Sequence, residues 1–141
     1  MIRFILAAIL FLNTIYLIAQ ELTLESVDQL RWNSRIILVK VDSDDQITLS
    51  TLEKANDAIN ERHINWFVFS GNSFYSNYED RIGRNFQANT LADYFKEDKN
   101  VLLLGKDGGV KLVADNLQLD EIFELIDSMP MRQMEMTTQS N

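Results

Sequence analysis

The sequence predicts a single α/β domain, with a β-α-β unit, a further helix and a β-β-α unit around a central mixed sheet. Two runs rich in β-branched and aromatic residues, 35–41 and 64–69, flank apolar residues at helical spacing, which is typical of a parallel strand pair. Two further apolar runs, 101–104 and 110–113, flank a glycine-containing turn and predict an antiparallel hairpin. The 141 residues suffice for one core and are too few for two ordinary domains.

The first 19 residues have the composition of a secretory signal peptide. A basic start precedes the apolar run 4–12, and Ala19 stands before a polar stretch. We expect cleavage after Ala19, which leaves a domain over 20–136 and a polar tail over 137–141. The alternative is an uncleaved anchor, because the stretch approaches the roughly 20 residues that span a bilayer. Both predict a periplasmic or secreted domain, and the cleaved form would have no membrane contact.

Composition and charge exclude several classes of function. After cleavage, 12 lysine and arginine residues (13 less Arg3) face 21 aspartate and glutamate residues, so the formal charge is −9. Such acidity repels nucleic acid and anionic lipid, so neither is an expected partner. The chain has no cysteine, which excludes a disulfide, a redox dithiol and cysteine ligands for zinc. With His63 as its one histidine, we expect no metal and no cofactor; a lone histidine at a helix end more often caps carbonyls or faces water than acts as a base.

The first half of the mature chain predicts a helical turn, a strand, a helix and a second strand. The turn is expected around Val27 and Leu30. Apolar residues at helical spacing predict one helix from 49 to about 62, capped by Thr48 or Ser50.

The second half predicts a loop, a short helix, the hairpin and a last helix. Residues 71–88 are irregular, and a loop of that length is either functional or partly structured. Thr90 is expected to open the short helix. An apolar stripe over 119–126 predicts the last helix, with Gln118 as a weak cap and Pro130 near its end. A parallel β-α-β unit followed by an antiparallel β-β-α unit is the core of a thioredoxin-like fold.

Two motifs in the second half resemble a known family. They are Gly105-Lys106-Asp107-Gly108-Gly109-Val110-Lys111 and Ile126-Asp127-Ser128-Met129-Pro130-Met131-Arg132, the latter followed by Glu135-Met136. Together with Leu30-Arg31-Trp32 and Arg35, they are similar to a bacterial, mostly exported family of domains of unknown function with a thioredoxin-like, peroxiredoxin-related fold. Relatives of that domain occur in vertebrate secreted sushi-repeat proteins and in an extracellular coiled-coil-domain protein. The resemblance implies a thioredoxin-like domain whose relatives generally lack the thiol pair, and it implies no particular activity.

The glycine-rich hairpin is the first candidate site. Two lysines beside two glycines supply the ammonium groups and backbone N–H groups of a pocket for a small anion. The candidate ligand-binding residues are Lys106, Asp107, Gly108, Gly109 and Lys111. The alternative is a tight turn whose lysines are solvated. The segment lacks a Gly-Lys-Ser or Gly-Lys-Thr opening a helix, so it is not a nucleotide-binding P-loop.

The methionine-rich segment after the last predicted helix is the second candidate site. Its candidate interaction residues are Asp127, Met129, Pro130, Met131, Arg132 and Glu135. Flexible methionines suit an adaptable binding surface, and they also suit a tail that docks on its own domain. Copper(I) binding through thioethers is a third alternative. Arg132 and Glu135 have the spacing of a helical ion pair.

Three aspartates, Asp42, Asp44 and Asp45, follow the first strand, where a thioredoxin-like fold has its active-site loop. Such a cluster could hold a hard cation, but the following residues break the calcium-loop pattern, and solvated acids are the alternative. We therefore assign no catalytic residue and no metal ligand. The leading hypothesis is a non-catalytic, exported binding or protein-interaction module whose partner is an exported or envelope protein. The alternative is a cysteine-independent enzyme or binder acting on a small anion near the hairpin.

Overall fold

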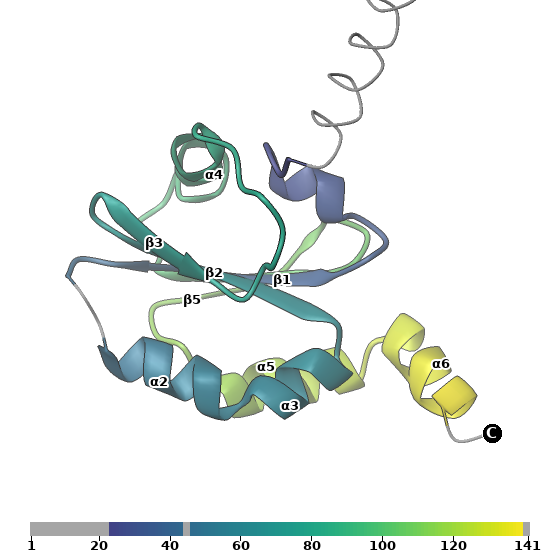
Figure 1. Cartoon of the computed structure of the whole chain (residues 1–141). Coiled ribbons are helices and arrows are strands. Elements are labelled where there is room, and N and C mark those ends of the chain that lie inside the picture. The colour runs from purple at the N-terminus through teal and green to yellow at the C-terminus, as the bar shows by residue number, and fades with distance from the viewer. Residues whose placement is uncertain (1–22, 44–45, 140–141) are drawn as a thin grey trace, which may run out of the picture.

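The computed structural model describes residues 23–43 and 46–139, and it is an α/β fold built on one five-stranded mixed sheet (Figure 1). The strands lie in the order β3-β2-β1-β4-β5. They are β1 (Arg35–Val41), β2 (Ile64–Ser70), β3 (Ser73–Ser76), β4 (Val101–Leu104) and β5 (Val110–Ala114). The helices are the 3₁₀ turn η1 (Val27–Leu30), α2 (Gln46–Lys54), α3 (Asn56–Glu61), α4 (Phe86–Tyr94), α5 (Leu119–Asp127) and α6 (Pro130–Gln139).

The strand pairing confirms the predicted order of units. β1 and β2 are parallel, in register from the Arg35–Ile64 pair to the Val41–Ser70 pair. β4 lies antiparallel to β1, and β5 lies antiparallel to β4, which is the predicted hairpin. A β-α-β unit joined to a β-β-α unit in this strand order is compatible with a thioredoxin-like fold.

Helices cover both faces of the sheet, with α2, α3 and α5 on one side and α4 with η1 on the other (Figure 1). Alternate residues of β1 point to opposite faces, so Ile37 and Val39 join one core and Ile36 and Leu38 join the other. A strand segment buried on both faces is mostly apolar, which explains the apolar run from Ile36 to Val39.

The structure corrects two predicted helix starts. The helix expected over 49–62 is two helices, because the backbone at Ala55 leaves helical geometry between α2 and α3. α2 already begins at Gln46, so Thr48 and Ser50 lie inside it and do not cap it. α4 begins at Phe86 and not at Thr90, because the Phe86 ring packs into the core, 4.8 Å from the Phe67 ring.

Two further segments have more structure than the sequence predicted. The irregular stretch 71–88 contains β3, which pairs with β2 at the sheet edge. Pro130 begins α6 and does not simply end α5, because the first position of a helix needs no backbone N–H donor. α6 continues to Gln139, so most of the predicted polar tail over 137–141 is helical. The expected turn η1 is confirmed, and Gln118 stands at the N-cap of α5 as predicted, without a side-chain cap hydrogen bond.

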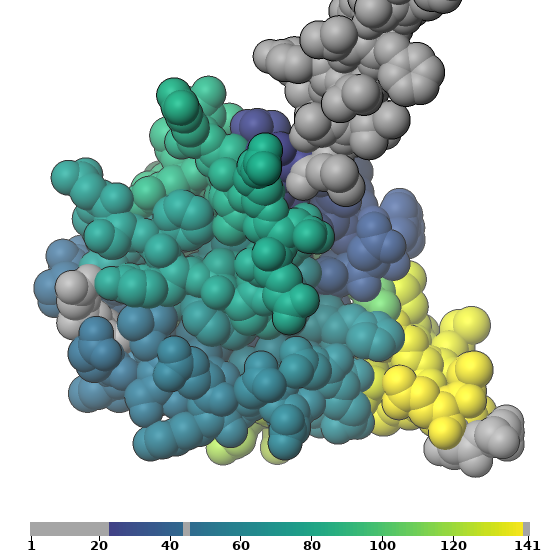
Figure 2. Space-filling model, viewed as in Figure 1, coloured from purple at the N-terminus to yellow at the C-terminus, as the bar shows by residue number. Residues whose placement is uncertain are grey.

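Helix α6 lies at the edge of the sheet where β1 and β2 begin (Figure 1), and it protrudes from the molecule at the lower right of Figure 2, in yellow. The predicted signal peptide over 1–19 and two of the three loop aspartates, Asp44 and Asp45, lie outside the described residues. Within 23–43 and 46–139, no helix is both long enough and apolar enough to cross a bilayer.

Candidate functional site

Four segments that are distant in the sequence meet at the sheet edge where β1 and β2 begin. They are the turn after η1, the α3–β2 connection, the β4–β5 hairpin and α6. The backbone N–H of Trp32 donates to the Lys106 carbonyl at 2.7 Å, and the N–H of Arg35 donates to the His63 carbonyl at 2.9 Å. These bonds join the turn after η1 to the hairpin and the start of β1 to the α3–β2 connection.

Strained backbone is concentrated at the same edge. Trp32 and His63 have φ angles of 66° and 51°, and Gly108 in the hairpin has a φ of 81°. A side chain in this left-handed region costs about 1–2 kcal/mol, which glycine avoids. Trp32 is nevertheless 66% exposed, so burial of its ring does not offset that cost. Strain of this kind is more frequent at functional sites than elsewhere.

Arg132 fastens the start of α6 to the rest of the domain. Its guanidinium is 0% exposed and donates to the Glu61 carboxylate at 2.6 Å, to the Glu61 carbonyl at 2.9 Å and to the Asp127 carboxylate at 3.2 Å. Asp127 also receives two hydrogen bonds from Arg62, at 2.6 and 3.0 Å. Burial tends to raise the pKa of Asp127, but the bonds from Arg62 and Arg132 outweigh it, so this pKa is lowered.

Arg35 joins the first strand to α6 across 100 positions of sequence. It is 1% exposed, and its Nη1 donates to the Arg62 carbonyl at 2.8 Å and to Glu135 Oε2 at 3.0 Å. Glu135 Oε1 also accepts from Lys106 Nζ at 2.7 Å. Burial tends to raise the pKa of Glu135, but the bonds from Lys106 and Arg35 prevail, so this pKa is lowered. Among the described residues, the buried Nε of Arg35 has no hydrogen-bond partner.

His63 lies beside this cluster and not at an isolated helix end. Its Nδ1 is 2.9 Å from Lys106 Nζ and 4.0 Å from the Glu135 carboxylate. Burial and the charge of Lys106 lower its pKa, and Glu135 opposes them only in part. A neutral imidazole therefore accepts a hydrogen bond from the Lys106 ammonium at neutral pH.

The hairpin has the geometry of an anion pocket, but its own side chain fills that pocket. The Asp107 carboxylate accepts from the Gly109 backbone N–H at 3.0 Å and from Lys111 Nζ at 2.7 Å. The bond from Lys111, followed by that from Gly109, lowers the pKa of Asp107. An external anion would have to displace this internal carboxylate.

The two candidate sites of the sequence converge on one cavity of about 610 Å³, between the hairpin and the α5–α6 junction. We call it the hairpin–helix cavity. Its walls are Arg35, Gly105, Lys106, Asp107, Lys111, Leu125, Met129, Pro130, Met131 and Met134. The methionines, Leu125 and Pro130 supply an apolar surface, and the hairpin and Arg35 supply its charged groups. Such a mixture is typical of ligand pockets.

The predicted site residues divide into two groups in the structure. Lys106, Asp107, Lys111, Met129, Pro130 and Met131 line the cavity, and Gly108 and Gly109 form the turn beside it. Asp127, Arg132 and Glu135 belong to the ion-pair network behind it. Arg132 and Glu135 do form the predicted pair, at 3.9 Å, although Arg132 is buried and holds α6 in place instead of forming part of the exposed surface.

Sequence reasoning missed Arg35, Leu125 and Met134 as cavity residues. An arginine directly before the apolar run 36–39 is a signal for a buried ion pair. Met134 follows Pro130 by one helical turn, so it would have been placed beside the other methionines had Pro130 been taken as a helix start.

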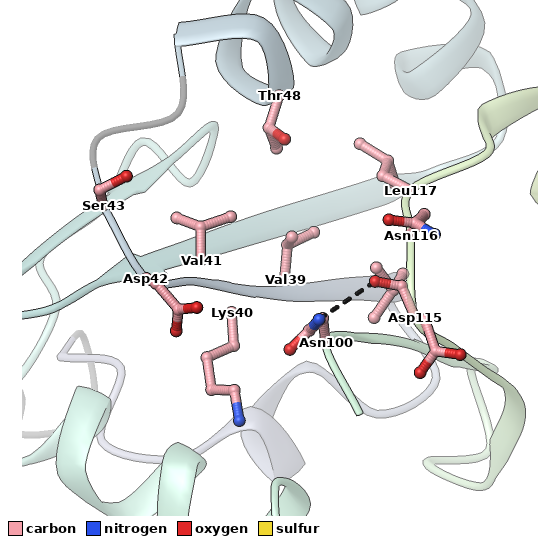
Figure 3. Close-up of a pocket in the computed structure, with 11 residues that line it drawn as sticks. Val39, Lys40, Val41, Asp42, Ser43, Thr48, Asn100, Asp115, Asn116 and Leu117 are labelled. Atoms are coloured by element: carbon pink, nitrogen blue, oxygen red, sulfur yellow. Dashed lines mark hydrogen bonds between the residues drawn. The ribbon is translucent and has the colours of Figure 1, made fainter. Parts of the chain in front are cut away.

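A second cavity, of about 340 Å³, lies at the opposite sheet edge, where β1 ends (Figure 3). Asp42, Ser43 and Thr48 line it, together with Asp115 and Asn116. Figure 3 shows the carboxylates of Asp42 and Asp115 on opposite sides of the hollow, with Asn100 bonded to the Asp115 carbonyl at 3.2 Å. In the part of the chain that the structure describes, no three potential histidine or carboxylate ligands come together as a metal site would require.

Comparisons with known proteins give one match. Neither the curated proteins nor the solved structures contain a match to this chain. A family model described as a domain of unknown function (DUF4174) matches residues 26–135, which include every described element except the end of α6. This chain therefore belongs to the DUF4174 family, defined by a domain of unknown function.

Proposed function

We propose that this chain is an exported, non-catalytic binding module on a thioredoxin-like scaffold, and that it binds its partner at the hairpin–helix cavity. One observation carries the proposal. The two segments that the sequence singled out independently, the glycine-rich hairpin and the methionine-rich segment, form the walls of a single cavity. Separate segments brought together around an apolar hollow are what a binding site requires.

The absence of cysteine supports a role without thiol chemistry. Nothing in the 141 residues can form a disulfide or act as a thiolate nucleophile. The edge that would hold a redox motif in a thioredoxin-like fold holds Asp42, Ser43 and Thr48 instead. The hairpin–helix cavity and the strained residues lie at the other edge of the sheet. The proposed binding site is therefore separate from the position of a thioredoxin-like redox motif.

The ion-pair network supports binding in preference to catalysis. Lys106 is engaged by Glu135, and Arg132 by Glu61 and Asp127. Groups held in this way position a helix and are poorly placed to transfer protons or to attack a substrate. They give α6, and the methionines on it, a fixed position beside the hairpin.

The alternative is a cysteine-independent enzyme or binder acting on a small anionic ligand near the hairpin, and for a bare inorganic anion it is less well supported. Asp107 already occupies the position between the Gly109 N–H and the Lys111 ammonium. A bare phosphate or sulfate would have to displace that carboxylate or share the Lys111 ammonium with it, and it would make no use of the apolar walls of the cavity.

Capture of bound material tests the binding function. The full chain, tagged at its C-terminus, is produced in an exporting host, recovered from the envelope fraction and analysed by mass spectrometry for proteins and small molecules. Met134→Glu places a charge on the cavity wall, and Ile47→Glu changes a similarly exposed apolar residue on α2. We expect a partner, such as an exported or envelope protein, that the wild type and Ile47→Glu hold and Met134→Glu loses. Equal recovery from all three chains, or none from any, would contradict the proposal.

Export is tested separately, by fractionation and N-terminal sequencing of the same chain. We expect the protein in the periplasmic or secreted fraction, with Gln20 as its first residue. A chain that stays in the cytoplasm with Met1 intact would contradict export and leave the cavity argument unchanged.

A further inference from the structure

The hairpin–helix cavity carries an excess of positive charge in an acidic protein. Three of its wall residues are cationic (Arg35, Lys106 and Lys111), and one, Asp107, is anionic. Glu135, which contacts Arg35 and Lys106 from behind, brings the local balance to one net positive charge. The whole chain has a formal charge of −8, so this excess is a local feature of the site.

Each of the three cations pairs with an internal carboxylate, but hydrogen-bond donors remain. Glu135 is shared between Arg35 and Lys106, and Asp107 is bound to Lys111. In the described structure the Nε of Arg35 is buried without a partner, although an unpaired buried donor is costly. Lys111 is the most accessible of the three cations, with a third of its side chain exposed. An ammonium has three N–H donors, so Lys111 can bond a second carboxylate beside Asp107, and one further anionic group would balance the net positive charge of the site.

The other walls of the cavity are apolar, so they fit a ligand whose anionic group carries an apolar chain. Leu125 and Met129 are half-buried wall residues, and Pro130, Met131 and Met134 are exposed ones. Met134 is 70% exposed, which leaves a large apolar side chain in water beside the cavity. Methionine has three rotatable bonds and a polarisable sulfur, so these walls adapt to a flexible alkyl chain.

Size and overall charge favour a small molecule over an acidic protein. The volume of about 610 Å³ lies in the range of small-molecule pockets, about 300–1,000 Å³. An acidic protein would meet the repulsion of the whole negative chain as it approached. A small ligand with a single charge meets mainly the local field of the cavity, because salt screens charges beyond about 8 Å.

We infer that the hairpin–helix cavity binds a small amphipathic carboxylate, with its carboxylate beside Lys111 and Lys106 and its apolar chain along Leu125, Met131 and Met134. The inference rests on the proposed binding function and names the ligand class for that site. No bond is made or broken, and the ligand leaves as it entered.

The test is titration of the full chain with decanoate below its micelle concentration, followed by calorimetry and by the ¹³C-methyl NMR signals of the methionines. Decanol is the uncharged control probe, and decylammonium is the control probe of opposite charge. We expect saturable binding of decanoate that shifts the Met131 and Met134 signals, and binding of the other two probes weaker by about tenfold, which corresponds to one charge-assisted hydrogen bond.

Matched lysine variants locate the carboxylate. Lys111→Met removes the cation at the cavity. Lys99→Met removes a similarly exposed lysine outside the cavity, which stands before β4 and pairs with Asp115 after β5. We expect decanoate affinity to fall about tenfold in Lys111→Met and to stay within about twofold in Lys99→Met. Both lysines are partly exposed, so both variants should fold, and far-UV circular dichroism verifies that.

Three results would overturn the inference: no saturable shift of the methionine signals, equal binding of decanol and decanoate, or equal losses in the two lysine variants. Failure of this ligand assignment is distinguishable from failure of the proposed binding function. If decanoate does not bind but Met134→Glu still loses a captured partner, the cavity is a binding site and only the ligand class is wrong.

Discussion

Lys106 Nζ donates a hydrogen bond to Glu135 Oε1 at 2.7 Å and so joins the β4–β5 hairpin to α6. Both side chains are largely buried, and Arg35 contacts the same carboxylate from the first strand. This pair forms the back of the hairpin–helix cavity, so the position of the methionines on α6 depends on it.

The Lys106–Glu135 pair should contribute more to stability than a surface pair does. A double-mutant cycle of Lys106→Met and Glu135→Gln, measured by urea unfolding, is expected to give a coupling free energy of about 1–3 kcal/mol. The control cycle of Lys99→Met and Asp115→Asn removes an exposed pair at 3.0 Å and should give below about 0.5 kcal/mol. Equal coupling in the two cycles would show that burial adds nothing to the pair.

Acid should loosen α6 before it unfolds the sheet. The pKa values of Glu135 and Asp127 are lowered in the folded chain, from the usual 4.5 and 3.8, because the bonds from their cationic partners outweigh burial. Their stabilisation is therefore complete above these usual values and is lost as the pH falls through the lower folded values.

Unfolding free energies of the wild type and Glu135→Gln, compared at pH 7 and at pH 3, measure this effect. The wild type should be the more stable chain at pH 7, and the difference should shrink at pH 3. A difference that is independent of pH would show that the carboxylate charge of Glu135 is not what stabilises α6.

Removing the internal carboxylate should open the anion pocket of the hairpin. In Asp107→Ala, the Gly109 N–H and the Lys111 ammonium lose their acceptor. We expect sulfate to shift the Gly109 amide signal saturably in this variant and not in the wild type. The combined Asp107→Ala and Lys111→Met variant should lose the response; a response that persisted would place the sulfate elsewhere.

Replacing Trp32 should stabilise the fold. Its φ of 66° is costly for a tryptophan, whereas asparagine adopts this region more readily. Trp32→Asn should raise the free energy of unfolding by about 0.5–1 kcal/mol, as measured by the urea midpoint. Ile47→Asn, an exposed apolar residue in α2, should lower it by a few tenths of a kcal/mol through helix propensity. A loss in Trp32→Asn larger than that in Ile47→Asn would mean that the indole packs usefully.

The fold was predictable because its signals are local. The unbroken apolar runs of β1 and β2 mark strands that are buried on both faces, and the Asp107–Gly108 step marks the hairpin turn. The helix boundaries were less predictable. The break at Ala55 has no proline or glycine, and the start of α4 is set by the packing of Phe86, which no local pattern reveals.

The parts of the site were predictable, but their assembly was not. Lys111 and Met131 could each be proposed from their own motif. They lie at one cavity because α6 packs beside the hairpin. That position of α6 requires a helix that starts at Pro130 and hydrogen bonds from Arg132 to Glu61, 71 positions earlier. Periodicity and turn rules cover a few residues, so contacts over this separation lie beyond their reach.

The contact between Arg35 and Glu135 links completion of the central strand's contacts to synthesis of the last helix. β1 is the central strand, and the carboxylate that pairs with its first side chain is available only after α6 has been synthesised. We therefore expect nascent chains that stop before residue 130 to remain sensitive to protease, and full-length chains to become resistant late in synthesis. Resistance of the shortened chain would show that the domain closes without α6.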